Sequence, residues 1–450
     1  MFEAADEIGG GTRSRELTVP GVLHDVCSAV HPFGVASPYL ASLPLGEHGL
    51  EWRWPDVDLA HPLDGGRAAV LVRSLPDTAA GLGKDGRAWS RTFGPLVEHF
   101  DQLATAILSP ILHVPRHPGT LLRFGPRAGL PATVFVRRFQ TDEARALFAG
   151  CAAHVFRPLN RPATSAAGLM LATAGHAVGW PVAAGGSHAI TRALASLLEK
   201  LGGTIETGVR VTSLAQLPRT RVTLFDTSPP ALVEIAGDAL PARSQRAFRR
   251  WKFGPGAYKV DLAVEGGVPW TAEACRRAGT VHVGGTFAEV AAAELDVHRG
   301  RMPERPFMLV GQQYLCDPQR SSGDVHPVWA YAHVPQGYAG DATDAVLAQI
   351  ERFAPGTRDR IVARHVIDPA GFEKYNPNYV GGDIATGAND VRQLVLRPRV
   401  SLDPYATGIP GVYLCSAATP PGAGVHGMCG HHAARRALDD LGVTARPKRG

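Results

Sequence analysis

One segment of the chain carries hydrophobic residues at helical spacing, and it is the clearest local pattern in the sequence. It begins after Gly185-Gly186-Ser187, where Ser187 is a suitable N-cap, and it ends before Gly202, a suitable helix stop. One face of a helix would bring its apolar positions together: Ile190, Leu194, Leu197, Leu198 and Leu201.

Strand-like apolar runs follow this predicted helix. They cover residues 204–206, 209–211 and 222–225, and the last run ends in Asp226. Together with the helix they predict a helix–strand–strand unit of α/β type.

The middle of the chain alternates between short apolar runs and polar turns. We expect helices at residues 93–106, 141–151, 288–295 and 341–353. We expect the strands of a mostly antiparallel sheet at residues 256–264, 279–283, 306–311 and 328–334. The segment 375–383 is rich in turn formers and predicts a loop.

The beginning of the chain has the pattern of a strand end. Residues 1–5 are mostly apolar, with an acid at Glu3, and a glycine-rich turn follows at residues 9–14. In a dinucleotide-binding fold, an acid that ends the second strand accepts hydrogen bonds from ribose hydroxyls. The matching glycine fingerprint would lie roughly 20 residues upstream of Glu3.

A second glycine-rich turn lies near the other end of the chain, between an apolar strand at 411–415 and a helix expected from His426 to about Leu441. Gly422-x-Gly424-x-x-Gly427 matches the dinucleotide fingerprint. The residues after it supply no second strand and no ribose-binding acid, so it is not a first βαβ unit. Its glycines and helix N-terminus would still suit an electron-rich group such as a reduced flavin ring. The alternative is a purely structural helix entry.

Composition narrows the function classes. The 450 residues are 45% hydrophobic and 19% charged, which is typical of a globular protein with two or three domains. The net charge of +5 is dispersed, and its densest run, at residues 246–252, lacks the interleaved aromatic residues of a nucleic-acid surface. We therefore expect no nucleic-acid partner.

The cysteines and the hydropathy of the chain indicate in which cellular compartment the protein works. The six cysteines form no Cys-x-x-Cys pair, so neither a zinc ribbon nor a disulfide framework is indicated, and reduced thiols favour a cytoplasmic protein. No apolar run approaches the roughly 18–20 residues that span a bilayer. A peripheral contact with a membrane surface remains compatible with the sequence.

Two further groups of polar residues contain side chains that can bind ligands. His426, Cys429, His431 and His432 could be read as a metal cluster, but residues at this spacing do not share one helix face, so we expect no metal. His24, Asp25 and His31 could touch a substrate or a flavin, although such loop residues are more often satisfied locally.

Several separated motifs together resemble the phytoene-dehydrogenase-like, FAD-dependent oxidoreductases. Residues 3–14 resemble the second-strand and glycine–arginine segment of that family, and residues 20–32 resemble the loop that follows it. Residues 185–229 resemble the middle flavin-domain segment. The segments 376–383 and 413–430 are similar to those of the phytoene-dehydrogenase-related branch. The first strand of the family and its Gly-x-Gly-x-x-Gly turn have no counterpart here.

The resemblance implies FAD as the cofactor. Glu3 would meet the adenosine ribose, while Gly10, Thr12 and Arg13 would lie along the pyrophosphate, where an arginine supplies charge-assisted hydrogen bonds. Val211 would offer backbone hydrogen bonds to the adenine.

The same resemblance assigns the other end of the cofactor. Gly424, Val425 and His426 would sit against the flavin ring. We assign three more residues to the substrate, and no catalytic residue: His31, Tyr379 and Asp383.

The predicted architecture is an α/β protein with two domains. The first is an FAD-linked Rossmann-type domain of the glutathione-reductase-like or amine-oxidase-like kind, N-terminally incomplete and built from residues 1–55, 179–235 and 396–450. The second is a substrate domain with a cap segment at 56–178 and an antiparallel sheet with helices at 236–395.

The predicted function is removal of a hydride from a C–H bond of an apolar, isoprenoid- or carotenoid-like substrate. Two alternatives stay open. One is a non-catalytic remnant that cannot hold FAD and acts as an interaction protein. The other is a flavin amine or alcohol oxidase on the same fold.

Overall fold

The computed structural model describes residues 1–110 and 117–443. Its helices are α1 Pro32–Val35, α2 Pro38–Ala41, α3 Leu75–Gly81, α4 Gly86–Val97, α5 Phe100–Ile107, α6 Pro118–Ala128, α7 Ala132–Phe135, α8 Asp142–Ala153, α9 Ser165–Ala177, α10 His188–Lys200, α11 Pro229–Ala236, α12 Ala242–Arg249, α13 Glu273–Arg276, α14 Phe287–His298, α15 Thr343–Phe353, α16 Pro369–Tyr375, α17 Val391–Leu396 and α18 Met428–Asp440. Its strands are β1 Ser14–Glu16, β2 Leu23–Asp25, β3 Trp52–Arg53, β4 Val57–Leu63, β5 Arg67–Leu71, β6 Val182–Ala183, β7 Thr223–Phe225, β8 Gly256–Glu265, β9 Ala278–Val283, β10 Met308–Gly311, β11 Val325–Val334, β12 Ile361–Ile367 and β13 Val412–Leu414.

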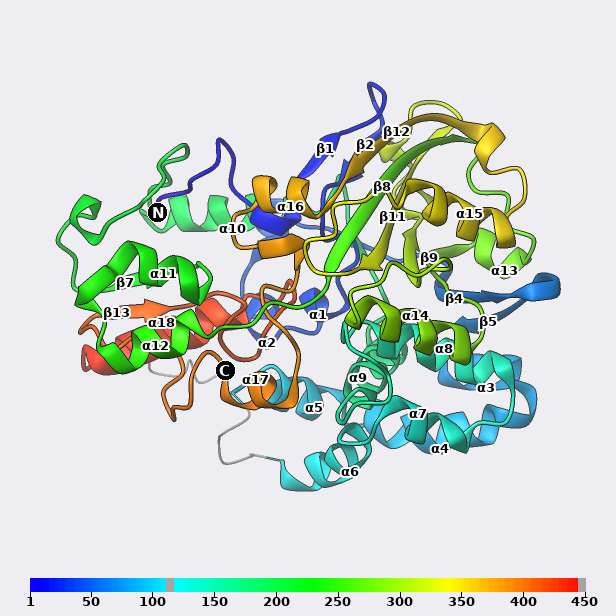
Figure 1. Ribbon diagram of the computed structural model, residues 1–450, viewed down its shortest axis with the longest axis horizontal. Coiled ribbons are helices and arrows are strands. Elements are labelled where there is room, and N and C mark those ends of the chain that lie inside the picture. The colour runs from blue at the N-terminus through cyan, green and yellow to red at the C-terminus, as the bar shows by residue number, and fades with distance from the viewer. Residues whose placement is uncertain (111–116, 444–450) are drawn as a thin grey trace.

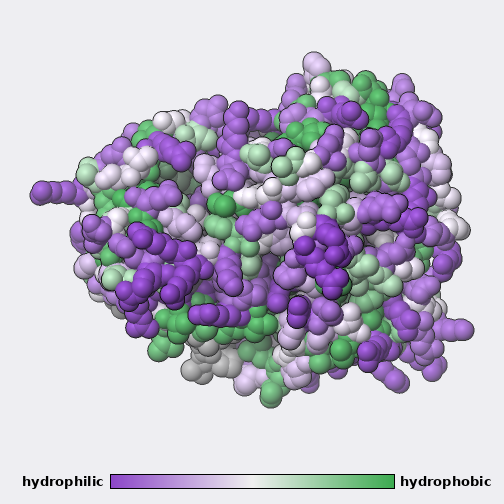
Figure 2. All heavy atoms as spheres, viewed as in Figure 1, coloured by the Kyte–Doolittle hydropathy of each residue, from purple (hydrophilic) through white to green (hydrophobic). Residues whose placement is uncertain are grey.

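Two lobes lie side by side in the molecule (Figure 1). One contains the N-terminus, β7, β13, α10, α11, α12 and α18. The other contains a large sheet with α13, α14 and α15, and the helices α3, α4 and α6 to α9 lie at its lower side. Figure 2 shows hydrophilic residues over most of this face, with hydrophobic residues gathered along its lower edge and at its upper right.

The large sheet has seven strands in the order β12-β8-β11-β10-β9-β4-β5. All neighbouring pairs are antiparallel except β4 and β9, which run parallel. The prediction of a mostly antiparallel sheet is therefore confirmed for its central strands. The edge strand β12 was not predicted, because its alternate residues are partly or fully exposed and include the polar pair Arg364 and His365.

Side-chain alternation gives this sheet two different faces. One face packs against α13 and α15 and is almost entirely apolar, with residues such as Val260, Leu262 and Val310. The opposite face packs against α4, α8, α9 and α14 and also meets Cys27 from the N-terminal segment. We call this second surface the inner face.

The first lobe contains two short parallel pairings. Residue Phe2 forms a parallel bridge with Glu206, and β7 pairs in parallel with β13. Strand ends that run parallel place their carboxyl termini at one edge, which is where ligands bind in open α/β sheets. Among the described residues, no strand pairs with β7 on the side opposite β13.

Several predicted elements differ in their limits. The helix expected at 93–106 is two helices, α4 and α5, because His99 between them has non-helical backbone angles. The run at 209–211 is irregular rather than a strand, following Gly208 with its positive φ of 71°. The predictions at 141–151, 288–295 and 341–353 are confirmed as α8, α14 and α15.

Candidate functional site

An acid–arginine pair lies at the start of the chain. The Nη2 atom of Arg13 is 3.6 Å from Oε1 of Glu3, and it also donates to the carbonyl of Glu7 at 2.7 Å. The guanidinium of Arg13 stands 5.2 Å from the ring centroid of Tyr375, whose hydroxyl donates to the carbonyl of Gly10. Arg13 is thereby buried in one orientation beside the partly exposed Glu3 carboxylate.

The backbone of Glu3 is tied to a neighbouring segment. Its N–H donates to the carbonyl of Glu206, and its own carbonyl accepts from the N–H of Val209 at 2.9 Å. The segment predicted to meet adenine thus runs beside Glu3, but the residue bonded to Glu3 is Val209. Val211 lies two residues further on and is half-buried. Its assignment to the adenine stays a prediction.

Helix α10 connects the two groups of predicted cofactor residues. The hydroxyl of Thr191, on this helix, lies 2.5 Å from the hydroxyl of Thr12. The preceding residue, Ile190, belongs to a small apolar cluster that includes Trp52 and Val425. The N-terminal glycine turn and the C-terminal glycine turn therefore lie near the same end of α10.

The C-terminal turn brings exposed backbone to the start of α18. Gly424 has a φ of +142°, in a region that favours glycine, and it and Ala423 are exposed. The carbonyl of His426 accepts from the Ser37 hydroxyl at 2.6 Å, and burial lowers the pKa of His426 to about 4. The helix begins at Met428, two residues after the predicted start, because Gly427 has a left-handed φ of 66°.

A third acid lies at the carboxyl edge of the parallel strands. Asp226 follows β7. Its side chain is exposed at the surface, but many protein atoms lie around its carboxyl group. Desolvation and the nearby charge of Glu3 raise its pKa to about 6. Two carboxylates and an exposed glycine turn at the end of parallel strands form a place for a hydroxyl-rich, extended ligand.

A buried charge network, which we call the Asp25 network, lies under this site. Arg320 bonds to Oδ2 of Asp25 at 2.5 Å and to Oδ2 of Asp317 at 2.8 Å, and all three side chains are at most 1% exposed. The other oxygen of Asp25 accepts from the hydroxyl of Ser14 and the N–H of Ser187. Burial would raise the pKa of Asp25, but Arg320 and these hydrogen bonds lower it.

The Asp25 network explains the glycine pair before α10. A Cβ on Gly186 would lie 2.6 Å from the Ser14 hydroxyl oxygen, and Gly186 has a φ of +105°. Ser187 occupies the N-cap position of α10 but makes no capping hydrogen bond. Its hydroxyl instead bonds to Nε2 of His31 at 2.8 Å. The predicted cap is therefore a positioning residue for His31.

A second buried ion pair lies on the inner face of the large sheet. The ammonium of Lys259 is bonded to Asp261, and Nδ1 of His24 is 3.4 Å from the same carboxylate oxygen. Lys259 also stands 5.9 Å from the ring centroid of Trp329, whose indole N–H donates to the carbonyl of Cys27. This pair was missed in the sequence. The pattern that could have revealed it is a lysine and an aspartate at alternate positions of an otherwise apolar strand.

Four histidines extend the polar part of the inner face. Nε2 of His154 lies 3.0 Å from Nε2 of His282, and Nδ1 of His333 lies 2.7 Å from Oε1 of Glu294. Nε2 of His61 is bonded to the carbonyl of Gly285 at 2.7 Å. Burial lowers the pKa of His61 to about 4 and that of His154 to about 3. The inner face therefore offers neutral hydrogen-bonding groups within an apolar core.

The three residues assigned to a substrate are all buried. His31 contacts Ser187, and Tyr379 lies beside Cys27, whose side chain packs at the inner face. Asp383 accepts from the backbone N–H groups of Gly254 and Ala385, so its contacts hold a loop in place. Their role in substrate binding stays a prediction.

Two other features bear on the site. Within residues 1–110 and 117–443, no group of three or more His, Cys, Asp or Glu residues is arranged to hold a metal ion.

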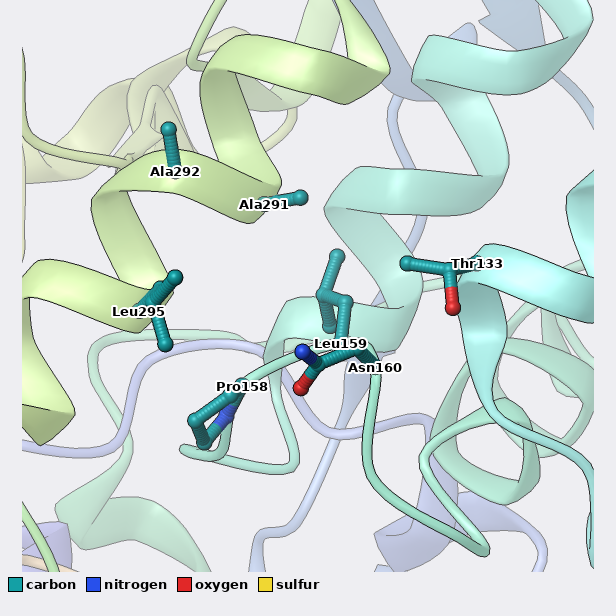
Figure 3. A pocket seen from close by; sticks show the side chains of 7 residues that line it. All are labelled: Thr133, Pro158, Leu159, Asn160, Ala291, Ala292 and Leu295. Carbon is teal, nitrogen blue, oxygen red and sulfur yellow. The ribbon is translucent and has the colours of Figure 1, made fainter.

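A cavity of about 190 Å³ lies between α14 and the segment 158–160 (Figure 3). Its lining contains no titratable side chain and none of the predicted site residues: Thr133, Pro158, Leu159, Asn160, Ala291, Ala292 and Leu295.

No protein-family model matches the chain. Among curated proteins, it is similar to pyridine nucleotide-disulfide oxidoreductase domain-containing protein 2 of Mus musculus, with 35% identity over 99 residues, or 22% of this chain and 17% of that protein. The Rattus norvegicus protein of the same name is 28% identical over 158 residues, or 32% of this chain and 27% of that protein. These matches span less than a third of either relative.

Solved structures are similar over almost the whole chain. Putrescine oxidase bound to putrescine has a TM-score of 0.59 at 16% identity, covering 98% of this chain and 93% of that one. An oxidoreductase from Methanosarcina mazei has a TM-score of 0.62 at 13% identity, covering 97% and 93%. Cyclohexylamine oxidase from Brevibacterium oxydans has a TM-score of 0.53 at 16% identity, covering 98% and 93%.

These likenesses confirm the predicted fold class. The chain is a mixed α/β protein with the fold shared by putrescine oxidase and cyclohexylamine oxidase.

Proposed function

We propose that the chain is an FAD-dependent oxidoreductase that removes a hydride from a C–H bond of a small organic substrate. The observation that carries the proposal is the meeting of the Glu3–Arg13 pair, Asp226 and the exposed Gly424 turn around the start of α10 and the carboxyl ends of β7 and β13. The similarity to oxidoreductases in sequence and in fold supports it.

The residues present fit the cofactor at both of its ends. The Glu3 carboxylate would accept hydrogen bonds from ribose hydroxyls, and Arg13 would donate to the pyrophosphate. Backbone N–H groups at the turn before α18 would meet the flavin ring, where the helix terminus favours negative charge. When bound, FAD supplies the hydride acceptor. The protein contributes orientation, exclusion of water and a rigid support beneath the ring.

The substrate would enter between the flavin and the inner face of the sheet. An apolar, isoprenoid-like molecule would suit the aromatic part of this face, which includes Trp329, Tyr331 and Phe156. The Lys259–Asp261 pair and the neutral histidines favour a second candidate, an alcohol or amine oxidase acting on a substrate with one polar group. Anaerobic flavin reduction by matched isoprenoid, alcohol and amine compounds would separate the two candidates.

We also propose a reducing compartment for this activity, namely the cytoplasm. All six cysteines are free, and four of them are buried: Cys27, Cys151, Cys275 and Cys429. No helix in the described part of the chain is long and apolar enough to cross a membrane.

Replacing Arg13 by alanine should weaken FAD binding by about 1.5–3 kcal/mol, the range for hydrogen bonds to charged groups. Fluorescence titration of FAD would measure the change. The matched control is Arg15→Ala, two residues along, where the side chain is 47% exposed and pairs with Glu7. Equal losses in both variants, or no loss in Arg13→Ala, would contradict the assignment. Circular dichroism would check that each variant is folded.

Gly424 offers a test of the flavin end. A Cβ at this position would lie 2.9 Å from the His426 ring, and the positive φ opposes any L side chain. We expect Gly424→Ala to cost about 1–3 kcal/mol of FAD binding, or to lower the flavin midpoint potential. The control Gly430→Ala adds a Cβ in open space on α18 and should do neither. Normal affinity and potential in Gly424→Ala would show that the turn is structural.

A further inference from the structure

Apolar side chains are exposed along one edge of the first lobe. Val391 is 42% exposed at the start of α17, and Val400 and Leu402, just after it, are 55% and 89% exposed. Leu402 and Val395 line one shallow cleft together with Pro110, Pro404 and Pro420, so the two segments meet at the surface. We call Val391, Val395, Val400 and Leu402 the apolar edge. Figure 2 shows hydrophobic residues gathered in this region, along the lower border of the molecule.

Basic residues border the apolar edge. The backbone of Lys252, just after α12, exchanges two hydrogen bonds with the side chain of Gln393 on α17, which fixes α12 beside the edge. The exposed basic side chains of this border, which we call the basic rim, are Arg243, Arg246, Arg249, Arg250, Lys252 and Arg392.

Two acids beside the apolar edge already have partners. Asp403 bonds to Arg436 at 2.6 Å, and the Asp390 carboxylate accepts from the N–H of Gln393 as the N-cap of α17. Arg399, between the edge and α12, adds to the positive potential near Arg243. The six basic residues of the rim outnumber the two other exposed acids beside α12, Glu234 and Asp238, so the rim presents an excess of positive charge next to exposed aliphatic side chains.

The cleft beside the edge lies over the glycine turn at the candidate site. Arg397 lines this cleft, is itself only 2% exposed, and donates to the carbonyl of Ala417 at 3.1 Å. Arg397 also packs against Gly422, the first glycine of the turn. Arg397 therefore separates the cleft from the glycine turn.

We propose that the apolar edge and the basic rim dock on the headgroup region of a membrane rich in anionic lipids. Aliphatic side chains inserted at the boundary between headgroups and acyl chains bury apolar area, and nearby arginines are attracted to anionic lipid. A second copy of the chain is a poorer occupant, because two basic rims brought together would repel each other. The proposal stands independently of FAD binding, since the surface is formed by residues outside the cofactor groups.

The test is co-sedimentation of the purified protein with vesicles. We expect binding to vesicles of phosphatidylcholine with phosphatidylserine, little binding to phosphatidylcholine alone, and release at high salt as the charges are screened. The double change Val400→Glu and Leu402→Glu should weaken binding by about tenfold or more. The matched control is Leu201→Glu, at the C-cap of α10, where the leucine is 77% exposed and should not matter.

Charge reversal tests the rim separately. Arg246→Glu with Arg249→Glu should reduce binding to the anionic vesicles by about thirtyfold or more, the loss expected when two basic residues at a lipid surface are removed and replaced by acids. Equal binding to neutral vesicles, or equal losses in the Leu201→Glu control, would overturn the proposal. So would a concentration-dependent dimer in sedimentation velocity that Leu402→Glu abolishes, since the edge would then belong to a second copy.

Discussion

The folded protein should lose stability as the pH falls from 6.5 towards about 4. Desolvation by burial lowers the pKa of five histidines from 6.5, to about 3 for His154 and about 4 for the others: His31, His61, His176 and His426. Below pH 6.5 the unfolded chain takes up protons at these positions while the folded protein does not. Each such histidine therefore costs about 1.4 kcal/mol of stability per pH unit in this window.

Three carboxyls offset part of this loss, because their pKa values are raised to about 6 and the folded protein protonates them before the unfolded chain does: Asp58, Asp226 and Asp383. Urea titrations at a series of pH values would give the slope of the unfolding free energy. His154→Gln should flatten that slope, because it removes one group that protonates only on unfolding. The control is His117→Gln, where the histidine is exposed at the start of α6. If His154→Gln changed the slope no more than His117→Gln, the neutral, buried state of His154 would be refuted.

Removing Arg320 should destabilise the fold by about 3–5 kcal/mol, the usual cost of leaving a buried ion pair without one partner. Arg320→Met keeps an apolar side chain but removes the charge that holds Asp25 and Asp317 together. Both carboxylates would remain buried, and the buried arginine that pairs with each of them would be gone. Urea unfolding at neutral pH measures the loss.

A surface arginine provides the comparison. Arg301 pairs with Asp296, but the arginine side chain is 59% exposed, so Arg301→Met should cost less than about 1 kcal/mol. If Arg320→Met cost no more than Arg301→Met, the Asp25 network would contribute nothing to the junction between β2, the start of α10 and the Asp317 turn. A large loss in Arg320→Met with intact circular dichroism at low denaturant would support it.

Local patterns in the sequence predicted the elements that depend on local physics. The helical spacing from Ile190 to Leu201 gave α10, and the turn around Gly424 was located between the correct strand and helix. The edge strand β12 was not predicted, because half of its side chains face solvent and no apolar alternation marks it. The break between α4 and α5 was also not predicted, since it depends on one backbone conformation at His99.

The candidate site was predictable only where its residues are close in the sequence. Glu3 and Arg13 share one segment, and their side chains lie 3.6 Å apart. Arg320 and Asp25 are separated by 295 positions, so no local pattern could pair them. The histidines of the inner face come from β4, β9, β11 and the end of α8, and each one alone looks like an ordinary core residue.

The parallel pairing of β7 with β13 also constrains how the chain reaches its native state. Thr223 pairs with Val412, so the first lobe closes only after the five strands β8 to β12 of the large sheet, which lie between these residues in the chain, have been synthesised. Closing a loop of that length carries an entropy cost that local contacts cannot offset, and such pairings form late in folding. During translation, the seven-stranded sheet can assemble while β7 waits with an unpaired edge. An unpaired strand edge attracts other chains, so we expect the emerging protein to depend on chaperones most during this interval.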